Sequence, residues 1–392
     1  MSGDRPVVVV VAEAAPMRGG IATFAETITA DPGLATAYEM RLLNTAKMAD
    51  REGGRFTLAN VRQIVVDVRR TFRAARTADV VHLQLVADPG LPVLRAAALN
   101  LAGSAGRARL VAHVHSAVGN AGRPEIAGYS VLDRLALRTL RRAQLVCTVS
   151  EAGTRTMRAF AGRTPVRTVD NAIDVAAFTP TRPDRTPPTL LFVGVVCRRK
   201  GTIQLARAAR RLRERGLTDW RLVVVGSQGP TPEPEFAEIV AEFAAAGLSD
   251  SLVGPEHGPQ VRDRLRDADI FVLPSFLEGQ PIAIIEAMAA GVPVVSTTVG
   301  AIPDLVRDGI EGRVVEPGDV EALADALAEL ISRPDLRTRM GTAIRLRAEA
   351  AHSLPQLSHA LAGLYAEVLG RTVPAGPPAG PVITRFSTGV SP

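Results

Sequence analysis

The chain has 392 residues, of which 46% are hydrophobic and 22% charged, with a formal net charge of +6 at pH 7. This composition excludes a disordered chain, and the length exceeds what one hydrophobic core usually serves, so two domains are expected. The charge favours polyanionic partners such as phosphates, nucleic acid or anionic lipid without selecting one. The only cysteines are Cys147 and Cys197, so no disulfide framework is expected and a reducing compartment fits.

The sequence predicts neither a signal peptide nor a membrane span. Its first 16 residues, MSGDRPVVVVVAEAAP, lack the order of basic region, apolar stretch and small-residue cleavage site. No apolar run approaches the roughly 20 residues needed to cross a bilayer. We therefore expect a cytoplasmic protein, and a place at the inner face of the cytoplasmic membrane is compatible with this.

The first half of the chain alternates strand-like and helix-like segments. It begins with a β-branched run, residues 6–14, which is typical of a strand buried on both faces. A Gly-containing loop and a helical pattern from Ile21 follow. Such alternation indicates a parallel sheet covered by helices. Further strand-like runs are at 79–85, 108–116, 143–150 and 165–171, and helical segments between them include 61–77 and 131–142.

A Pro-rich passage, FTPTRPDRTPPT at 178–189, interrupts this pattern and is the predicted linker. The alternation then restarts. Strands are predicted at 189–196, 220–227, 251–253, 269–275, 292–298 and 312–317, and helices at 202–215, 234–246, 259–267, 281–290, 319–332 and 355–369. We expect an α/β fold of two Rossmann-like, doubly wound parallel-sheet domains that face a cleft. The predicted segments are an N-terminal domain 1–178, a linker 179–189, a C-terminal domain 190–354, a last helix 355–370 and a disordered tail 371–392.

Ligands of open α/β sheets bind beyond the carboxyl ends of the strands, so residues just after each strand are informative. Gly19 and Gly20 follow the first strand and allow close approach of a ligand at a helix N-terminus, although the spacing is not GxGxxG. His115 stands nearest the end of the run 108–116. An ordinary turn and a structural histidine are the plainer interpretations of these residues.

A basic cluster, Arg198, Arg199 and Lys200, precedes Gly201 at the start of a predicted helix. The helix dipole already favours an anion there, and arginine forks beside a lysine suit a diphosphate. A solvated charged loop is the alternative, and the cluster alone does not decide between the two.

The stretch EGQPIAIIEAMAAGVPVV, residues 278–295, carries two glutamates in an otherwise apolar run. Pro281 fits the first position of a helix and Gly291 its C-terminal cap, so the helix is predicted at 281–290. Glu278 then lies in the loop before the helix, facing the cleft, and Glu286 lies within the helix. The loop amides would point toward a negative group, whereas a carboxylate suits polyol hydroxyls. A ligand with diphosphate, ribose and sugar would satisfy both.

These motifs resemble the retaining glycosyltransferases of family 4, which have the GT-B fold and two glutamates separated by seven residues. The resemblance extends over most of the chain, and its last helix resembles the one that usually crosses back onto the N-terminal domain. The matching segments are RGGIATF (18–24), DVVHLQ (79–84), HVHS (113–116), VCTVSE (146–151), VDNAIDVAAFTP (169–180), FVGVVCRRKG (192–201), LVVVGSQGP (222–230), ADIFVLPS (268–275), the stretch from Glu278 and HALAGLYAEVL (359–369).

The resemblance implies that the N-terminal domain binds the acceptor and the C-terminal domain the nucleotide sugar. Glu278 would contact the donor sugar, Glu286 the ribose and Lys200 the diphosphate, while Gly20 and His115 would lie near the reacting centre. The implied catalytic residues are His115, Glu278 and Lys200, and the implied donor-binding residues are Gly19, Gly20, Arg198, Arg199, Lys200, Gly279, Gln280, Pro281, Ile282 and Glu286.

The sequence departs from the family pattern at three places. Val195 stands where the family often has a second diphosphate arginine, so Arg198 or Arg199 would replace it. Gln280-Pro281 stands where an aromatic-Gly pair is common, which bears on donor identity. The segment NAID at 171–174 replaces the usual Asn-Gly.

The resemblance implies sugar transfer from a nucleotide-diphosphate sugar to an acceptor hydroxyl, with retention of anomeric configuration. No metal or other cofactor is expected, because no Asp-x-Asp motif follows a strand. The acceptor is a small molecule, a glycan or a lipid-linked molecule. Alternatives are a nucleotide-sugar isomerase or hydrolase on the same fold, and a non-catalytic nucleotide-sugar-binding protein. A nucleic-acid partner is disfavoured, because only 4% of residues are aromatic and no recognised motif occurs.

The segment VLDRLALRTLRR, residues 131–142, places several arginines along one side of a predicted helix. It could dock peripherally on anionic lipid, as a lipid-linked acceptor would require. A solvated helix face over a core is the plainer interpretation.

Overall fold

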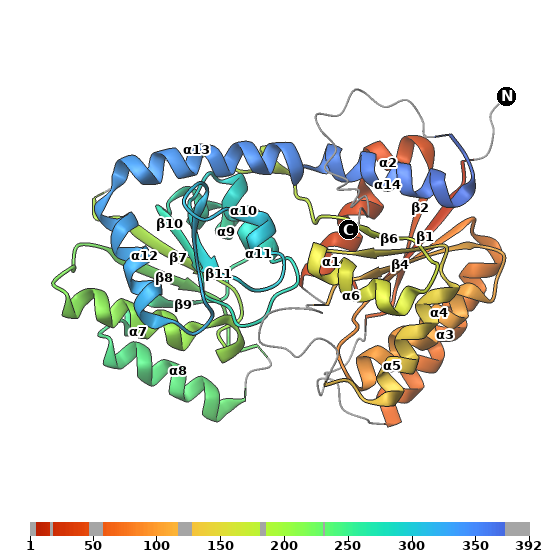
Figure 1. The fold of residues 1–392 in the computed structure, drawn as a ribbon, viewed down its shortest axis with the longest axis horizontal. Helices are drawn as coiled ribbons and strands as arrows, with labels where there is room; N and C mark the ends of the chain where they lie inside the picture. The colour runs from red at the N-terminus through yellow and green to blue at the C-terminus, as the bar shows by residue number, and fades with distance from the viewer. Residues whose placement is uncertain are drawn as a thin grey trace, which may run out of the picture. The chain divides into compact units, whose positions relative to one another are not determined.

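The computed structural model describes residues 5–15, 19–46, 58–116, 128–180, 186–229 and 232–372. The chain divides into two compact units, one of Met1–Ala172 with Leu354–Pro392 and one of Ile173–Ser353. Each contains a six-stranded parallel sheet with flanking helices (Figure 1). The predicted α/β class with two Rossmann-like sheets is confirmed.

The first unit has the strand order β2-β1-β3-β4-β5-β6, so the chain reverses its direction of winding beside β1. Its strands are β1 (Val7–Ala12), β2 (Glu39–Asn44), β3 (Val80–Leu85), β4 (Arg109–Val114), β5 (Leu145–Thr148) and β6 (Val166–Thr168). Its helices are α1 (Gly20–Ala30), α2 (Pro32–Ala37), α3 (Leu58–Thr77), α4 (Leu91–Ser104), α5 (Val131–Leu137), the 3-10 helix η1 (Arg138–Arg142), α6 (Glu151–Ala161) and α14 (Leu354–Leu369).

Both faces of the first sheet are buried because successive strand residues point to opposite sides. In β1, Val9 and Val11 pack with the residues of α3, α4 and η1, whereas Val8 and Val10 pack with those of α1, α2 and α14. The last helix thus joins the first unit. The hydroxyl of Tyr38 donates to the carbonyl of Ala362 at 3.0 Å.

The second unit has the strand order β12-β11-β10-β7-β8-β9 and one continuous hydrophobic core. Its strands are β7 (Thr189–Val193), β8 (Arg221–Val225), β9 (Leu252–Gly254), β10 (Ile270–Leu273), β11 (Val294–Thr297) and β12 (Gly312–Val315). Its helices are the 3-10 turns η2 (Val175–Ala177), η3 (Arg198–Lys200) and η4 (Ser249–Ser251), with α7 (Thr202–Glu214), α8 (Glu233–Ala245), α9 (Pro259–Arg266), α10 (Ile282–Ala289), α11 (Ile302–Leu305), α12 (Val320–Ser332) and α13 (Pro334–Ala351).

The observed elements differ from the predicted ones in a few places. β2 was not predicted, because this edge strand is largely exposed and carries no apolar run. The helix predicted at 131–142 ends as α5 at Leu137 and continues as η1. Helix α10 begins at Ile282, one residue after the predicted start, and Pro281 is its N-cap. The division between units falls after Ala172, and the predicted tail from residue 373 lies outside the described residues.

None of the described helices is long and apolar enough to cross a membrane.

Candidate active site

Two loops at the carboxyl edge of the second sheet form the centre of the candidate site. β7 and β10 are hydrogen-bonded neighbours, so the turn η3 after β7 lies beside the loop 274–281 after β10. The Phe276 amide donates to the Arg199 carbonyl at 2.8 Å, and the Arg199 guanidinium donates to the Leu277 carbonyl at 3.1 Å. The two loops are therefore held together by one backbone hydrogen bond and by one from the Arg199 side chain.

Two of the predicted site residues, Lys200 and Glu278, contact each other directly. Lys200 Nζ lies 2.5 Å from Glu278 Oε1, and the Ser275 hydroxyl donates to the same oxygen at 2.7 Å. Glu278 is only 6% exposed, so it is a buried carboxylate in an ion pair and not an exposed loop tip. A buried charge requires such a partner. The pair places a cation, Lys200, beside a carboxylate, Glu278, that can accept hydrogen bonds from hydroxyl groups.

Two glycines allow the loop after β10 to pack so closely. Gly201 has φ +70°, and a Cβ there would lie 1.9 Å from the Pro274 carbonyl oxygen. Gly300 has φ +61°, and a Cβ there would lie 2.2 Å from the Glu278 carbonyl oxygen. The Ala301 amide also donates to the Gly279 carbonyl at 2.8 Å. Any side chain at either glycine would displace the loop, so this geometry is built into the backbone.

Glu286 is in the middle of α10 and is half-buried among apolar residues. Burial raises the pKa of its carboxyl group to about 7, although the guanidinium of Arg262 acts in the opposite direction. No hydrogen bond or ion pair joins this carboxylate to another described residue. An acceptor without a partner in an apolar setting is suited to ligand hydroxyls.

The remaining predicted donor-binding residues of the second unit lie in two places. They form the segment that leads into the N-terminus of α10, and the basic turn η3. Gly279, Gln280, Pro281 and Ile282 connect the Glu278 loop to the first turn of the helix, and Gln280 is buried. The arginines of the turn diverge. Arg199 faces this loop, whereas Arg198 is ion-paired with Glu238 of α8. Of the two candidates to replace an arginine at Val195, Arg199 is the better placed.

His115 is at the carboxyl end of β4 in the first unit, where it joins a stack of histidines. Its ring lies 4.3 Å from that of His113, which stacks on His82 at 5.5 Å, and Phe24 contacts the first two edge-on. At the inner end, His82 Nδ1 lies 2.8 Å from the Tyr365 hydroxyl of α14. Burial lowers the pKa of His82 and of His115 to about 3, so the stack is neutral at physiological pH.

Gln84 of β3 orients His115. Its Oε1 lies 2.7 Å from His115 Nε2, so a neutral imidazole donates from Nε2 and keeps the lone pair on Nδ1. No described residue hydrogen-bonds Nδ1. His115 is half-buried and can therefore accept a hydrogen bond through Nδ1.

Gly19 and Gly20 begin α1 in the same unit, and Arg18 lies outside the described residues. Gly19 has φ +144°, and nothing lies within 4 Å of a Cβ built on it. Because Phe24, one turn into α1, contacts His115, this glycine turn and the histidine stack belong to neighbouring parts of the first sheet's edge.

Among the described residues, no group of three or more His, Cys, Asp and Glu side chains could hold a metal ion. The histidine stack does not form such a group, because its rings face one another.

Sequence reasoning missed the residues that hold these groups in place. Ser275 stands two residues after β10 and could have been suspected from that position. Gln84 shares a face of β3 with His82, at strand spacing, which was an available signal. Gly300 and Tyr365 are remote in sequence from the groups they support, so no local pattern indicates them.

The chain matches known glycosyltransferases in sequence and in fold. The family model described as "Glycosyltransferase Family 4" matches residues 8–177, and "Glycosyl transferases group 1" matches residues 176–347. The chain is 32% identical over 270 residues to the alpha-maltose-1-phosphate synthase of Mycobacterium tuberculosis, covering 62% of this chain and 67% of that protein. It is 33% identical over 282 residues to the D-inositol 3-phosphate glycosyltransferase of Thermobifida fusca, covering 67% of this chain and 63% of that protein.

Solved structures with the same fold include the sucrose-phosphate synthase of Thermosynechococcus elongatus, with a TM-score of 0.73 and 18% identity over 93% of this chain and 100% of that chain. Anabaena HepE in complex with UDP has a TM-score of 0.70 and 16% identity over 92% of this chain and 100% of that chain. The two sheets, the two family matches and the relatives agree: the chain belongs to the GT-B glycosyltransferases of family 4 type.

Proposed function

We propose that the chain transfers a sugar from a nucleotide-diphosphate sugar to an acceptor hydroxyl, with retention of the anomeric configuration. The observation that carries the proposal is the charge arrangement of the second unit. Lys200 is bonded to the buried Glu278 beside the entrance of α10, and Glu286 stands without a described partner within that helix. In this proposal Lys200 binds the diphosphate of the donor, Glu278 its sugar and Glu286 its ribose.

The cationic side of the site would stabilise the leaving group. As the bond between the sugar C1 and the phosphate oxygen breaks, its electron pair passes to the diphosphate. Lys200 supplies a positive charge, Arg199 a fork of donors, and the loop before α10 its backbone amides. The ion pair with Glu278 keeps Lys200 in position before the donor arrives.

The two carboxylates would accept hydroxyls. Glu278 is anchored by Lys200 and Ser275 through Oε1, which fixes the orientation of the whole carboxylate toward the sugar. Glu286 would receive ribose hydroxyls. Because its pKa is raised to about 7, its acceptor strength should be highest above that pH, where it is ionised.

His115 supports the proposal as a neutral acceptor. With Nε2 committed to Gln84, the lone pair of Nδ1 is available for a hydroxyl of the donor sugar. The acceptor oxygen would attack C1 from the face that the diphosphate leaves, and its proton would pass to the departing phosphate oxygen. No metal enters this scheme, because Lys200, Arg199 and the helix amides supply the positive charge.

The donor base, the sugar and the acceptor are not chosen by these residues. UDP-sugars are the first donors to test, because HepE, which shares the fold, has been solved with UDP and with UDP-glucose. We place the enzyme in the cytoplasm, where nucleotide sugars are made. A small molecule, a glycan and a lipid-linked molecule remain the acceptor classes.

The proposal is tested by following UDP-, GDP- and ADP-sugars by NMR with and without a mixture of acceptor alcohols. Donor consumption that requires an acceptor and gives a product of the donor's anomeric configuration is the expected result. Product of inverted configuration would contradict retention. Equal consumption without any acceptor would instead favour the isomerase or hydrolase, and tight donor binding without consumption would favour a binding protein.

A further inference from the structure

Helix α3 of the first unit buries polar residues and exposes apolar ones. Asp67 and Thr71 are fully buried, because Asp67 forms an ion pair with Arg95 of α4 at 3.1 Å that docks α3 on its neighbour. The outward face instead carries exposed large hydrophobic side chains, and Leu58 at its start is 87% exposed. The buried polar residues help to hold α3 on α4, whereas the exposed hydrophobic ones contact no core of the unit. The exposed hydrophobic residues of α3 are Leu58, Val61, Val65, Val66 and Phe72.

The exposed apolar residues of α3 form a stripe with arginines beside it. At about 100° per residue, Val61, Val65 and Phe72 lie within about 40° of one another around the helix axis. The arginines 62, 69 and 73 occupy the adjoining sector, and all are exposed. An apolar stripe bordered by arginine is the pattern of a helix that lies in a membrane interface, where long basic side chains reach the head groups.

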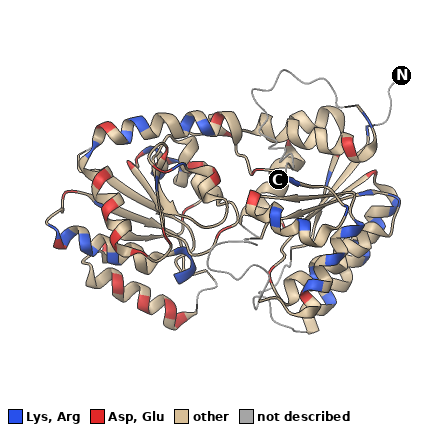
Figure 2. Cartoon of the chain, viewed as in Figure 1, with Lys and Arg blue, Asp and Glu red and all other residues tan. Residues whose placement is uncertain are grey.

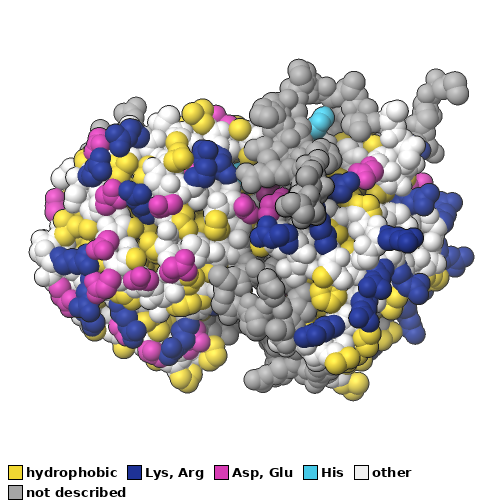
Figure 3. All heavy atoms as spheres, viewed as in Figure 1, with side chains coloured by type: hydrophobic (Ala, Val, Ile, Leu, Met, Phe, Trp, Pro, Cys, Tyr) yellow, Lys and Arg dark blue, Asp and Glu magenta, His cyan; other side chains and the backbone are white. Residues whose placement is uncertain are grey.

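The same pattern continues on α5, and α4 lies between the two helices. Val131, Leu132 and Leu135 are exposed on α5, and Val131 is 76% exposed. Leu101 is exposed on α4, which packs against both α3 and α5. We call this face, made of the outward residues of α3, α4 and α5 with η1, the basic-apolar face. Figure 3 shows yellow and dark blue side chains over these helices, with acidic ones sparse.

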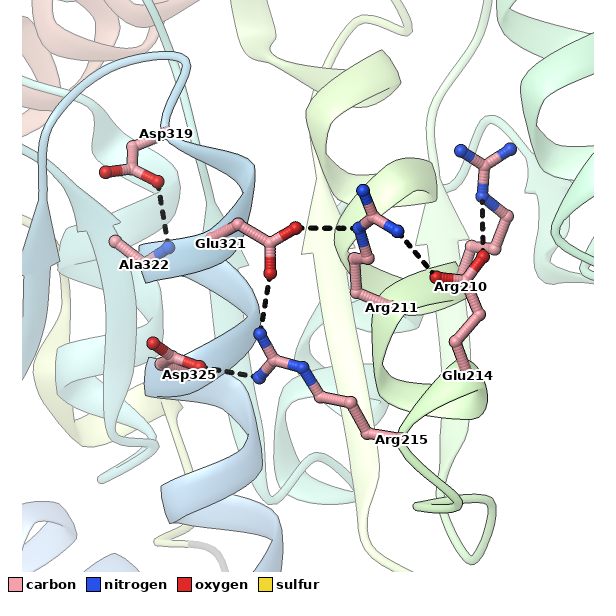
Figure 4. Close-up of polar contacts among 8 residues, drawn as sticks. All are labelled: Arg210, Arg211, Glu214, Arg215, Asp319, Glu321, Ala322 and Asp325. Carbon is pink, nitrogen blue, oxygen red and sulfur yellow. Dashed lines mark hydrogen bonds and ion pairs between the residues drawn. The ribbon is translucent and has the colours of Figure 1, made fainter.

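The arginines of this face differ from those of the second unit. Arg211 of α7 and Arg215 just after it both reach Glu321 of α12 at 2.7 Å, and Arg215 also reaches Asp325 at 2.5 Å (Figure 4). In Figure 2, blue on α7 stands beside red on α8 and α12, whereas blue predominates over α3 and α5. No ion pair joins an acidic described residue to the exposed arginines of the basic-apolar face at positions 62, 69, 70, 73, 76, 138 and 142.

We propose that the basic-apolar face docks on the surface of an anionic lipid bilayer. Unneutralised arginines attract anionic head groups, while the apolar stripes of α3 and α5 enter the interface. A second copy of the chain fits less well, because a two-fold contact would set the same arginines against one another. Docking here would bring the first unit to a lipid-linked acceptor, but the surface itself does not depend on the proposed transfer reaction.

Flotation of the full chain with vesicles tests the proposal. Vesicles of phosphatidylcholine with 30% phosphatidylglycerol should bind the chain, binding should fall as salt rises, and phosphatidylcholine alone should bind little. Arg62→Glu with Arg69→Glu should weaken binding at least about tenfold, since each basic residue near the surface contributes about 1 kcal/mol. Leu58→Ser with Val131→Ser should weaken it without changing the salt dependence.

The matched control is Arg339→Glu with Leu346→Ser on α13 of the second unit, where both side chains are exposed, and it should bind as the wild type does. Folding of each variant is checked by its thermal transition. The proposal is overturned if the control variant loses as much vesicle binding as the test variants do. The absence of vesicle binding would also overturn it. If the chain instead self-associates, as light scattering would show, and Val131→Ser abolishes this, the face joins two copies of the chain and does not dock on lipid. Loss of vesicle binding with transfer to soluble acceptors unchanged supports docking and separates it from the proposed function.

Discussion

The two units treat the ionisable groups of their candidate sites in opposite ways. The second unit keeps charges there, with Lys200 bonded to Glu278 and Glu286 without a described partner. The first unit keeps its histidines neutral in one stack, where burial lowers the pKa of His82 and of His115 to about 3. The second unit thus offers a cation and two carboxyl groups, whereas the first offers neutral hydrogen-bonding groups.

This contrast gives the units opposite responses to acid. The histidines are neutral when folded but take up protons below about pH 6.5 when unfolded, so the first unit loses stability as the pH falls below that value. Glu286 binds its proton more tightly when folded, with a pKa of about 7 against an ordinary 4.5. The second unit therefore gains stability from Glu286 as the pH falls from 7 toward 4.5.

The chain's aromatic residues allow the units to be followed separately. Its one tryptophan, Trp220, is in the second unit, and its three tyrosines, Tyr38, Tyr129 and Tyr365, are in the first. Tryptophan fluorescence thus reports unfolding of one unit and tyrosine circular dichroism that of the other.

The largest effect is expected from removal of the cation in the second unit. Lys200→Ala should lower the transfer rate by about 10²–10³, the usual loss when one group that stabilises developing charge is removed. Arg198→Ala is the matched control, because Arg198 is paired with Glu238 and should cost less than about threefold. The measurement is the steady-state transfer rate of each variant, after Trp220 fluorescence has shown that the second unit still unfolds as in the wild type. Near-wild-type turnover in Lys200→Ala would contradict the proposal that Lys200 stabilises the leaving diphosphate.

Glu286→Gln should weaken donor binding while it strengthens the fold. Loss of the charged acceptor is expected to weaken affinity at least about tenfold. At pH 8 the second unit should gain up to about 3 kcal/mol in unfolding free energy, because the buried charge is gone. Urea titration followed by Trp220 fluorescence measures this gain. An equal gain at pH 5, where Glu286 is already protonated, would contradict the raised pKa.

His113→Leu should flatten the acid response of the first unit. Both ring nitrogens of His113 are buried without a partner among the described residues, and burial lowers its pKa well below the usual 6.5. Each such histidine costs up to about 1.4 kcal/mol per pH unit below 6.5. The tyrosine transition at pH 5.5, compared with that at pH 8, should shift less in the variant. An unchanged shift would mean that the stack does not carry the response.

The smallest effect is expected at Gln84, which positions His115. Gln84→Leu should free the ring to change tautomer and lower the rate by about tenfold or less. Nitrogen NMR of the wild-type imidazole should detect the proton on Nε2, and the variant should give a mixture. A proton on Nδ1 in the wild type would contradict the orientation, whatever the activity.

Much of the fold could be predicted because both sheets are parallel and doubly covered. Their strands are continuous apolar runs, and Gly or Pro marks their ends, as at Pro281 and Gly291. β2 escaped prediction because an edge strand has no apolar run. The half-buried loops that contain Lys200 and Glu278 were located from motifs, since they follow strands.

The contacts that complete the site could not be predicted from the sequence. The Lys200–Glu278 bond joins residues 78 positions apart, and only the pairing of β7 with β10 brings them together. The pKa of Glu286 depends on how deeply its carboxyl group is buried in the folded unit, which the sequence does not give. The stack under His115 depends on α14, which returns from the far end of the chain.

The central claim is that the second unit binds a nucleotide-diphosphate sugar through Glu286, and thermal unfolding followed by Trp220 fluorescence tests it most directly. Wild-type protein and Glu286→Ala would be compared at pH 8 with UDP-, GDP- and ADP-sugars, since a bound ligand stabilises the folded state by mass action. We predict that one of these donors raises the midpoint for the wild type by several degrees and leaves that of Glu286→Ala nearly unchanged. A wild type that no nucleotide sugar stabilises, or an equal shift in the variant, would contradict the account.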